Sequence, residues 1–307
     1  MTTPPALLIA GIGTRDERRA NAFRDFVREL GTRNPGLPVA GGFTGQSPLP
    51  LGDAVAGLAD EGVTRFAVVP LTLIPSERAE QDLTAALAGE CELRPDTSFV
   101  RARPLGPHPR LLAILERRLN EALGDGPRRS PSDRAETTVL LVGPGSVTPE
   151  SNAEVHRAAR LLWEGRGFGG VETAFVSMAA PDVASGLDRC ARLGARRIVV
   201  LPYFLFAGTA ADRAQQQAEG WALAYPDIEV VTADVPGPSE ELMELVMERY
   251  REAAGDEADH KAGDVAGETA EDAAEEAAGD AAGDETGGSV AVPAQQGRQS
   301  DSPTHVR

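Results

Sequence analysis

The chain has 307 residues, 41% of them hydrophobic, and a formal net charge of −17 at pH 7. This charge argues against nucleic acid as a partner, because few phosphates would be neutralised. Its two cysteines have no metal-ligand spacing, and no apolar stretch approaches the ~18 residues of a membrane helix. We therefore expect a cytoplasmic protein of about two domains, with no membrane segment.

The first 124 residues alternate between short apolar runs and segments with helical spacing of apolar residues. Residues 6–10 predict a strand buried on both faces, and Ala20, Phe23 and Phe26 predict an amphipathic helix over residues 16–30. Alternating strands and helices favour a parallel sheet covered by helices. The same reasoning predicts strands at 39–43, 64–70 and 98–104, and helices at 51–61, about 81–88 and 109–123.

The second half repeats the first at a constant spacing of 132 residues. Gly11-Ile-Gly-Thr14 corresponds to Gly143-Pro-Gly-Ser146, and Phe43 corresponds to Phe175. The repeat indicates two tandem flavodoxin-like α/β lobes, residues 1–124 and 136–253, joined by a polar linker at 125–135. Its predicted elements are strands at 137–142, 171–175, 196–201 and 229–233 and helices at 153–163, 183–193, 211–225 and 240–250.

Residues 254–307 have a different composition from the two lobes. They hold thirteen acidic and three basic side chains, so −10 of the total charge of −17 lies here. The segment consists mainly of Ala, Gly, Asp and Glu and has too few apolar residues to form a core. We expect it to be a disordered acidic tail.

The candidate ligand site lies where the predicted strands end, because open parallel sheets bind ligands at the carboxyl ends of their strands. Gly11-x-Gly13-Thr14 follows the first strand, yet it lacks the third glycine of a dinucleotide fingerprint and the lysine of a phosphate-binding loop. The turn is therefore a weak nucleotide signal. A cleft between two similar lobes is the expected binding surface.

Several segments carry a resemblance to one family. They are LLIAGIGTR at 7–15, PVAGGF at 38–43, AVVPLTL at 67–73, PLGPHP at 104–109, NAEVHRAARLLW at 152–163 and LPYFLF at 201–206. With these motifs the chain resembles the sirohydrochlorin chelatases, in the long two-lobed form found in actinobacteria. The resemblance implies two chelatase-like lobes that bind a tetrapyrrole between them and insert Co2+ or Fe2+, in cobalamin or sirohaem biosynthesis. The metal would be a substrate, and no tightly bound cofactor is implied.

The chain departs from the family pattern at the metal-binding positions. Ile12, Gly45 and Arg78 stand where the family has histidine, glutamate and histidine. Holding a divalent first-row metal and accepting pyrrole protons require imidazole or carboxylate, which these residues do not supply. Asp82 keeps the family's residue, and Glu77 and His108 are the other weak candidate ligands. The corresponding positions in the second lobe are Pro144, Ser177 and Ala210.

Arginines and aromatic residues are the candidate substrate-binding groups. The guanidinium groups of Arg15 and Arg78 suit the carboxylates of a sirohydrochlorin-type ring, although both could instead form local ion pairs. Tyr203 could stack on the ring or pack in the core. The family pattern adds the remaining candidates, which are Gly11, Gly13, Thr14, Phe43 and Ser47.

Three functions follow from these observations. The first is metal insertion that relies on Asp82, Glu77 or His108, or on distortion of the ring. The second is a paralogue that binds a tetrapyrrole or another polycarboxylate without inserting metal, as a carrier or regulator. The third is a two-lobed binding protein for an unrelated anion. A monomer and a dimer are both compatible with the sequence.

Overall fold

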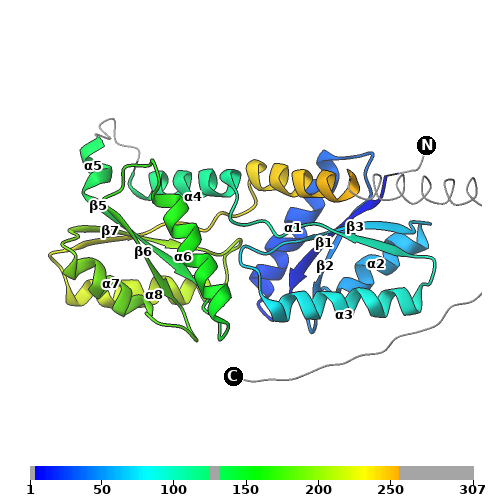
Figure 1. The fold of residues 1–307 in the computed structure, drawn as a ribbon, viewed down its shortest axis with the longest axis horizontal. Coiled ribbons are helices and arrows are strands. Elements are labelled where there is room, and N and C mark those ends of the chain that lie inside the picture. The colour runs from blue at the N-terminus through cyan, green and yellow to red at the C-terminus, as the bar shows by residue number, and fades with distance from the viewer. Residues whose placement is uncertain (1–3, 125–130, 256–307) are drawn as a thin grey trace, which may run out of the picture. The chain divides into compact units, whose positions relative to one another are not determined.

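The computed structural model describes residues 4–124 and 131–255 (Figure 1). The predicted tail at 254–307 lies outside these residues except for 254–255, which continue the last helix. The described residues form two four-stranded parallel sheets with helices on both faces. The predicted fold class is thereby confirmed. No helix in the described part of the chain is long and apolar enough to cross a bilayer.

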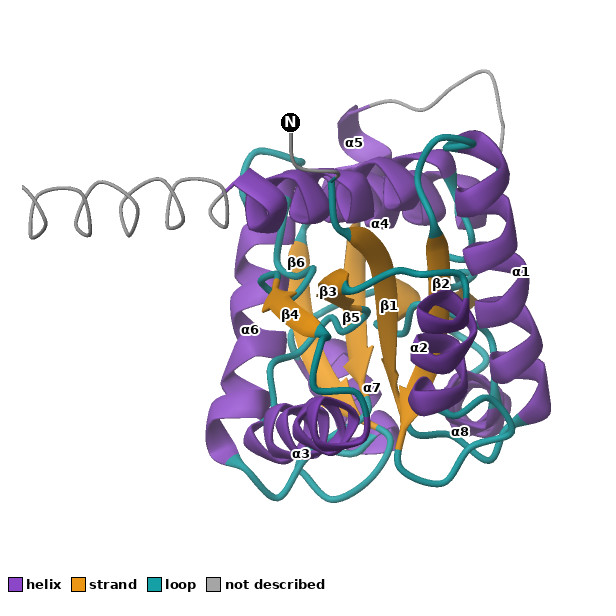
Figure 2. Cartoon of the chain, turned by 90° about the vertical axis from the view of Figure 1, so that its right-hand side faces the viewer, coloured by secondary structure: helices purple, strands orange, loops and turns teal. Residues whose placement is uncertain are grey.

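The first sheet has the strand order β2-β1-β3-β4 (Figure 2). Its centre is β1 (Ala6–Ile12), paired on both sides and almost completely buried, as expected for a continuous apolar run. The other elements are β2 (Val39–Thr44), β3 (Arg65–Pro70) and β4 (Ser98–Arg101), with α1 (Glu17–Arg33), α2 (Leu51–Asp60), α3 (Glu77–Leu93) and α4 (Pro109–Ala122).

The second sheet repeats this topology in the order β6-β5-β7-β8. A short helix, α5 (Pro131–Ala135), occupies the end of the predicted linker; the rest of the linker, 125–130, lies outside the described residues. The strands are β5 (Thr137–Gly143), β6 (Gly170–Phe175), β7 (Arg197–Pro202) and β8 (Glu229–Thr232). The helices are α6 (Pro149–Trp163), α7 (Val183–Arg192), α8 (Thr209–Ala224) and a C-terminal helix at 240–255.

Successive residues of β1 face two different layers of helices. Leu7 and Ile9 share a core with Phe23 and Phe26 of α1, whereas Leu8 packs in a separate core with α2 and α3. The period of two along a strand produces this division. β5 is divided in the same way, with α6 on one face and α7 and α8 on the other.

The last helix of each repeat packs on the opposite lobe. In Figure 1, α4 lies over β7 and α6, which it contacts, and the C-terminal helix lies over the first lobe. The Tyr250 hydroxyl donates to the Pro5 carbonyl at 2.8 Å, and Arg249 Nε donates to the Pro104 carbonyl at 3.2 Å. Each repeat therefore supplies part of the other's core, and both belong to one compact unit.

Some sequence expectations need correction. Of the two cysteines, Cys190 is buried, whereas Cys91 is exposed because its position is on the solvent face of α3. Helix α3 begins earlier than expected, at Glu77, because the Ser76 side chain accepts from the Ala79 N–H and caps it. The last strand of each repeat is one to three residues shorter than expected.

Candidate functional site

A cavity of about 390 Å3 lies between the two lobes. It is formed where β1, β3, β5 and β7 end, together with the first turns of α1 and α8. This is the edge of a parallel sheet at which ligands bind, and the volume is within the range of small-molecule sites. The cavity joins loops from both repeats.

The walls of the cavity are mostly apolar, with a smaller number of polar residues in the lining. Leu71, Leu73 and Ile74 come from the first lobe, and Phe204 and Phe206 come from the second. The polar lining consists of Thr14, Asp16, Arg19, Thr72 and Thr209. Such a lining suits a ligand with a large apolar body and a small number of anionic or polar substituents.

Asp16 joins the first turns of two helices across the lobe boundary. One carboxylate oxygen accepts from the N–H groups of Arg18 and Arg19, at 3.0 and 3.3 Å, and caps α1. The other accepts from the N–H and hydroxyl of Thr209, at 2.6 and 2.8 Å. Gly208, the N-cap of α8, has no side chain, so Asp16 supplies the acceptor from the opposite lobe.

These hydrogen bonds lower the pKa of Asp16 from 3.8 to about 2; the largest contribution comes from the Thr209 N–H. Such a carboxylate is a weak proton acceptor at neutral pH, and its oxygens are already engaged. Beside it, Arg18 forms an ion pair with Asp212 of α8. The lobes are thus held together at one side of the cavity by charged and polar contacts.

Arg19 lies one helical turn from Asp16 and is half-buried. Burial lowers the pKa of its guanidinium, partly offset by the charge of Asp16. No hydrogen bond or ion pair joins this guanidinium to another described residue. It is the single cation among the described residues that line the cavity.

Two of the predicted substrate-binding residues line the cavity. The Thr14 hydroxyl accepts from the Asp16 N–H at 3.1 Å and so orders the turn that enters α1. Tyr203 is 2% exposed, and burial raises the pKa of its hydroxyl. Only a small part of its side chain is therefore available to a ligand.

The residues Gly11, Gly13 and Phe43 do not line this cavity. Phe43 is buried against Phe23, with ring centroids 4.4 Å apart. A Cβ atom at Gly11 would lie 2.5 Å from the Phe43 ring, and one at Gly13 would lie 2.5 Å from the Thr44 carbonyl. In this structure the two glycines allow close packing of the turn after β1.

Arg15, Ser47 and Arg78 also lie outside the cavity lining. Arg15 donates to the Gln46 side chain at 3.1 Å, and Ser47 Oγ accepts from the Leu49 N–H. The Arg78 side chain is 91% exposed and lies 3.8 Å from an Asp82 oxygen. The guanidinium that the structure places in the cavity is that of Arg19, which the sequence reasoning did not select.

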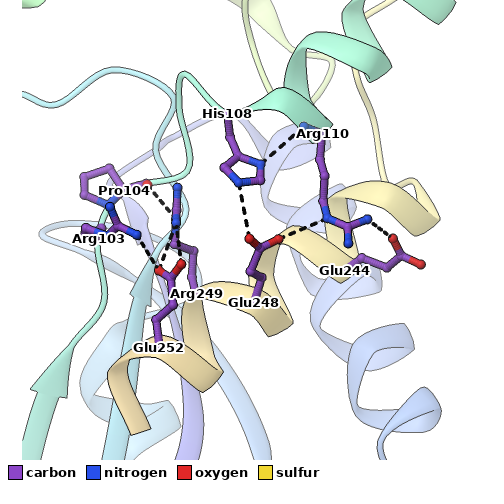
Figure 3. Close-up of polar contacts among 8 residues, drawn as sticks. All are labelled: Arg103, Pro104, His108, Arg110, Glu244, Glu248, Arg249 and Glu252. Carbon is purple, nitrogen blue, oxygen red and sulfur yellow. Dashed lines mark hydrogen bonds and ion pairs between the residues drawn. The ribbon is translucent and has the colours of Figure 1, made fainter. Parts of the chain in front are cut away.

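The three candidate metal ligands are not brought together. Glu77 accepts from Gln81, and Asp82 faces Arg78, both on the exposed side of α3. His108 caps α4: its Nδ1 accepts from the Arg110 N–H at 3.3 Å (Figure 3).

The other His108 nitrogen, Nε2, lies 3.4 Å from Glu248. Burial lowers the pKa of His108. In the neutral ring Nε2 carries the proton, because Nδ1 accepts from the Arg110 N–H. Both ring nitrogens are therefore engaged in structural contacts. No group of three or more His, Cys, Asp or Glu side chains able to hold a metal occurs among residues 4–124 and 131–255.

Ile12, at the family's first ligand position, lies at the end of β1 between two cavities. The smaller one has a volume of about 10 Å3, room for about one water molecule. Gly45, at the second ligand position, has a φ of +72° and no atom within 4 Å of an added Cβ. Neither Ile12 nor Gly45 therefore supplies a side-chain donor for a metal at this edge of the sheet.

One sequence signal points to Arg19. One face of α1 carries residues spaced 4, 3 and 4 apart, which are Arg19, Phe23, Phe26 and Leu30. The three apolar residues of this stripe are buried. A cation at the end of an inward-facing stripe indicates a site rather than a solvated surface. Asp16 also fits the N-cap position, but its bond to Thr209 joins residues 193 apart and has no local signal.

The fold defines a two-lobed α/β protein with a cavity between its duplicated parallel-sheet lobes. The CbiX family model matches residues 6–122 and 138–253, which is most of the chain. The chain therefore belongs to the CbiX family, and the expected relationship to the sirohydrochlorin chelatases is confirmed.

Two curated relatives come from Priestia megaterium. A sirohydrochlorin cobaltochelatase is 33% identical over 192 residues, covering 62% of this chain and 61% of the relative. A sirohydrochlorin ferrochelatase is 31% identical over 161 residues, covering 52% and 58%. The chain thus spans less than two thirds of either relative.

Solved structures support the fold. SirB from Bacillus subtilis with Fe3+ aligns with a TM-score of 0.69 at 20% identity, covering 83% of this chain and 98% of that one. DR2241 from Deinococcus radiodurans, described as similar to chelatases, aligns with a TM-score of 0.60 at 22% identity, covering 81% and 55%. Both likenesses concern the two-lobed architecture.

Proposed function

We propose that this protein binds a sirohydrochlorin-type tetrapyrrole in the cavity between its lobes and that Co2+ or Fe2+ enters the ring there. The observation that carries the proposal is the inter-lobe cavity, with apolar walls and one guanidinium that has no hydrogen-bond or ion-pair partner among the described residues. Apolar side chains suit the faces of a macrocycle, and a guanidinium suits its carboxylates. The relatives' named activities and the family membership support the same reaction class.

In this proposal the protein binds and orients the tetrapyrrole. Asp16, with its pKa of about 2 and both oxygens hydrogen-bonded, does not accept pyrrole protons at neutral pH. The protons therefore leave to water, and the substrate metal arrives from solution as a hydrated ion. If the cavity walls hold the macrocycle in a non-planar shape, the nitrogen lone pairs become exposed to the metal, and metal insertion is accelerated.

A second function, binding without metal insertion, is favoured by a specific observation. Ile12, Gly45 and Arg78 replace the family's ligand set, and Glu77, Asp82 and His108 do not assemble another. A protein of this kind would carry a tetrapyrrole or regulate its use. Both functions are compatible with a role in cobalamin or sirohaem biosynthesis and with the expected cytoplasmic location. The free thiols of Cys91 and Cys190 suit a reducing compartment.

Absorption spectroscopy under anaerobic conditions separates the two functions. Purified full-length protein is mixed with sirohydrochlorin and then with Co2+ or Fe2+, and loss of the free-base spectrum is compared with a protein-free control. Faster insertion supports the chelatase proposal. A spectral shift on binding, with insertion at the control rate, supports the carrier function. A spectrum unchanged by the protein contradicts both.

Restoring the family's ligands tests the site assignment. Ile12→His, Gly45→Glu and Arg78→His together are expected to raise the rate of insertion. Glutamate at position 45 costs about 1 kcal/mol because φ is +72°, but space is open around it. If the folded triple variant inserts metal no faster than wild type, the carboxyl end of the first sheet is not the metal entry site.

A further inference from the structure

Arg19 has an unusual environment for an arginine of α1. Its helix position places it on the same face as the buried Phe23 and Phe26, and its guanidinium borders the inter-lobe cavity. The other arginines of this helix lie more openly and have partners: Arg18 pairs with Asp212, and Arg24 donates to Asn21 at 2.6 Å. The remaining two, Arg28 and Arg33, form ion pairs with carboxylates.

Partial burial of a guanidinium costs solvation free energy, and without a partner no ion pair compensates this cost. Asp16, the N-cap of the helix, attracts Arg19 electrostatically, but its oxygens accept from backbone N–H groups and from the Thr209 hydroxyl. Five N–H donors of Arg19 therefore remain available to a molecule in the cavity. This arrangement provides a site for an anion.

The repeat shows that this cation belongs to one side of the cavity. The position corresponding to Arg19 in the second copy, 132 residues later, is Ser151. Ser151 is buried, and its hydroxyl donates to the Pro75 carbonyl across the lobe boundary at 3.0 Å. One copy thus uses this position for contact between the lobes, whereas the other presents a charge to the cavity.

We propose that Arg19 binds a carboxylate of the ligand through a bidentate contact and fixes which edge of the ligand enters the cavity. The inference deepens the proposed function, on which it rests for the identity of the ligand. The apolar walls accept the body of the molecule, and the asymmetry between Arg19 and Ser151 gives it one orientation. Arg15 and Arg78, both outside the cavity, are not required for this contact.

Two probes test the inference in full-length protein. Uroporphyrin I is a tetrapyrrole with eight carboxylates, and benzenehexacarboxylate is a planar polycarboxylate without a macrocycle. We expect Arg19→Gln to weaken binding by about tenfold or more, because a charge-assisted contact is lost. Arg19→Lys keeps the charge without the planar fork and should lie between Arg19→Gln and wild type. The matched control is Arg24→Gln, the same change on the exposed side of α1, with affinity within about twofold of wild type.

The outcomes separate this inference from the proposed function. Arg19-dependent binding of both probes supports both. Arg19-dependent binding of benzenehexacarboxylate alone supports the anion site and contradicts the tetrapyrrole proposal. Binding of uroporphyrin I that is equal in wild type and Arg19→Gln overturns the inference only, and binding of neither probe by wild type overturns both.

Thermal unfolding checks that the Arg19→Gln variant is folded. Since Arg19 has no partner in the described structure, the midpoint without ligand should equal or exceed that of wild type. A lowered midpoint together with weaker binding of both probes would assign Arg19 a structural role instead. The Arg19→Lys variant then separates a structural role from a binding role. A purely structural loss of affinity would not depend on the charge at position 19.

Discussion

Replacing Asp16 by alanine tests whether one carboxylate stabilises the contact between the lobes. The change removes the N-cap of α1 and both hydrogen bonds to Thr209 at the start of α8. Loss of an N-cap costs about 1 kcal/mol. Two further charge-assisted bonds add about 1–2 kcal/mol after allowance for partial exposure of Asp16. The free energy of unfolding should therefore fall by about 2–3 kcal/mol.

The matched control is Asp182→Ala. Asp182 caps α7 by accepting from the Ser185 N–H at 2.8 Å, without a bond to the other lobe. This change should cost about 1 kcal/mol, equivalent to a fall in Tm of about 2–4 °C, whereas Asp16→Ala should lower Tm by about 5–10 °C. Thermal unfolding by circular dichroism measures both. Equal losses in the two variants would refute a stabilising role for the bonds between the lobes.

The difference between wild type and Asp16→Ala should also depend on pH. The folded-state pKa of Asp16, about 2, lies below its ordinary value of 3.8, so the charged form stabilises the folded state. This contribution is complete above pH 4–5 and is lost as pH falls toward 2. Denaturant unfolding at pH 7 and pH 3 should show a smaller difference at pH 3. A constant difference would mean that the charge of Asp16 does not carry the effect.

Three further predictions concern the packing of the chain. Tyr250→Phe leaves a backbone carbonyl of the first lobe without its donor and should lower the free energy of unfolding by about 1 kcal/mol, measured with denaturant. Gly145→Ala should prevent stable folding, because the added Cβ would lie 1.8 Å from a carbonyl oxygen. The control is Gly194→Ala, which has a similar φ but open space around the added Cβ and should lower the free energy of unfolding by about 1 kcal/mol. A thiol reagent should modify exposed Cys91 in the folded protein but not Cys190, whose burial raises its pKa to about 12; rapid modification of both would contradict the packing of α7.

The strands and most of the helices were predictable because their signals are local. Short apolar runs predicted the eight strands that the described residues form, and the repeat at 132 residues predicted that the two sheets share one topology. The exchange of α4 and the C-terminal helix was not predicted. An apolar stripe such as Leu111, Leu115 and Leu119 shows that a helix has a buried face, but it does not specify which sheet covers that face.

The candidate site was predictable in position but only partly in its residues. The rule for parallel sheets led to the loops after β1 and β3, and Thr14 and Tyr203 do line the cavity. The sequence pointed to Arg15 and Arg78 because they lie in those loops or directly after them, and Arg19 was not a candidate. Their exposure depends on the tertiary arrangement, in which the first turn of α1, rather than the loop before it, faces the second lobe.

The exchanged last helices have a consequence for synthesis of the protein on the ribosome. When the first repeat has emerged, α4 has no second sheet to cover, and the first sheet lacks the helix that contacts it through Tyr250. The part of this apolar face that α1 does not cover stays open until residues 240–255 leave the exit tunnel. Completion of the first lobe therefore waits for the last element of the second, and an interruption between the repeats would leave an aggregation-prone chain.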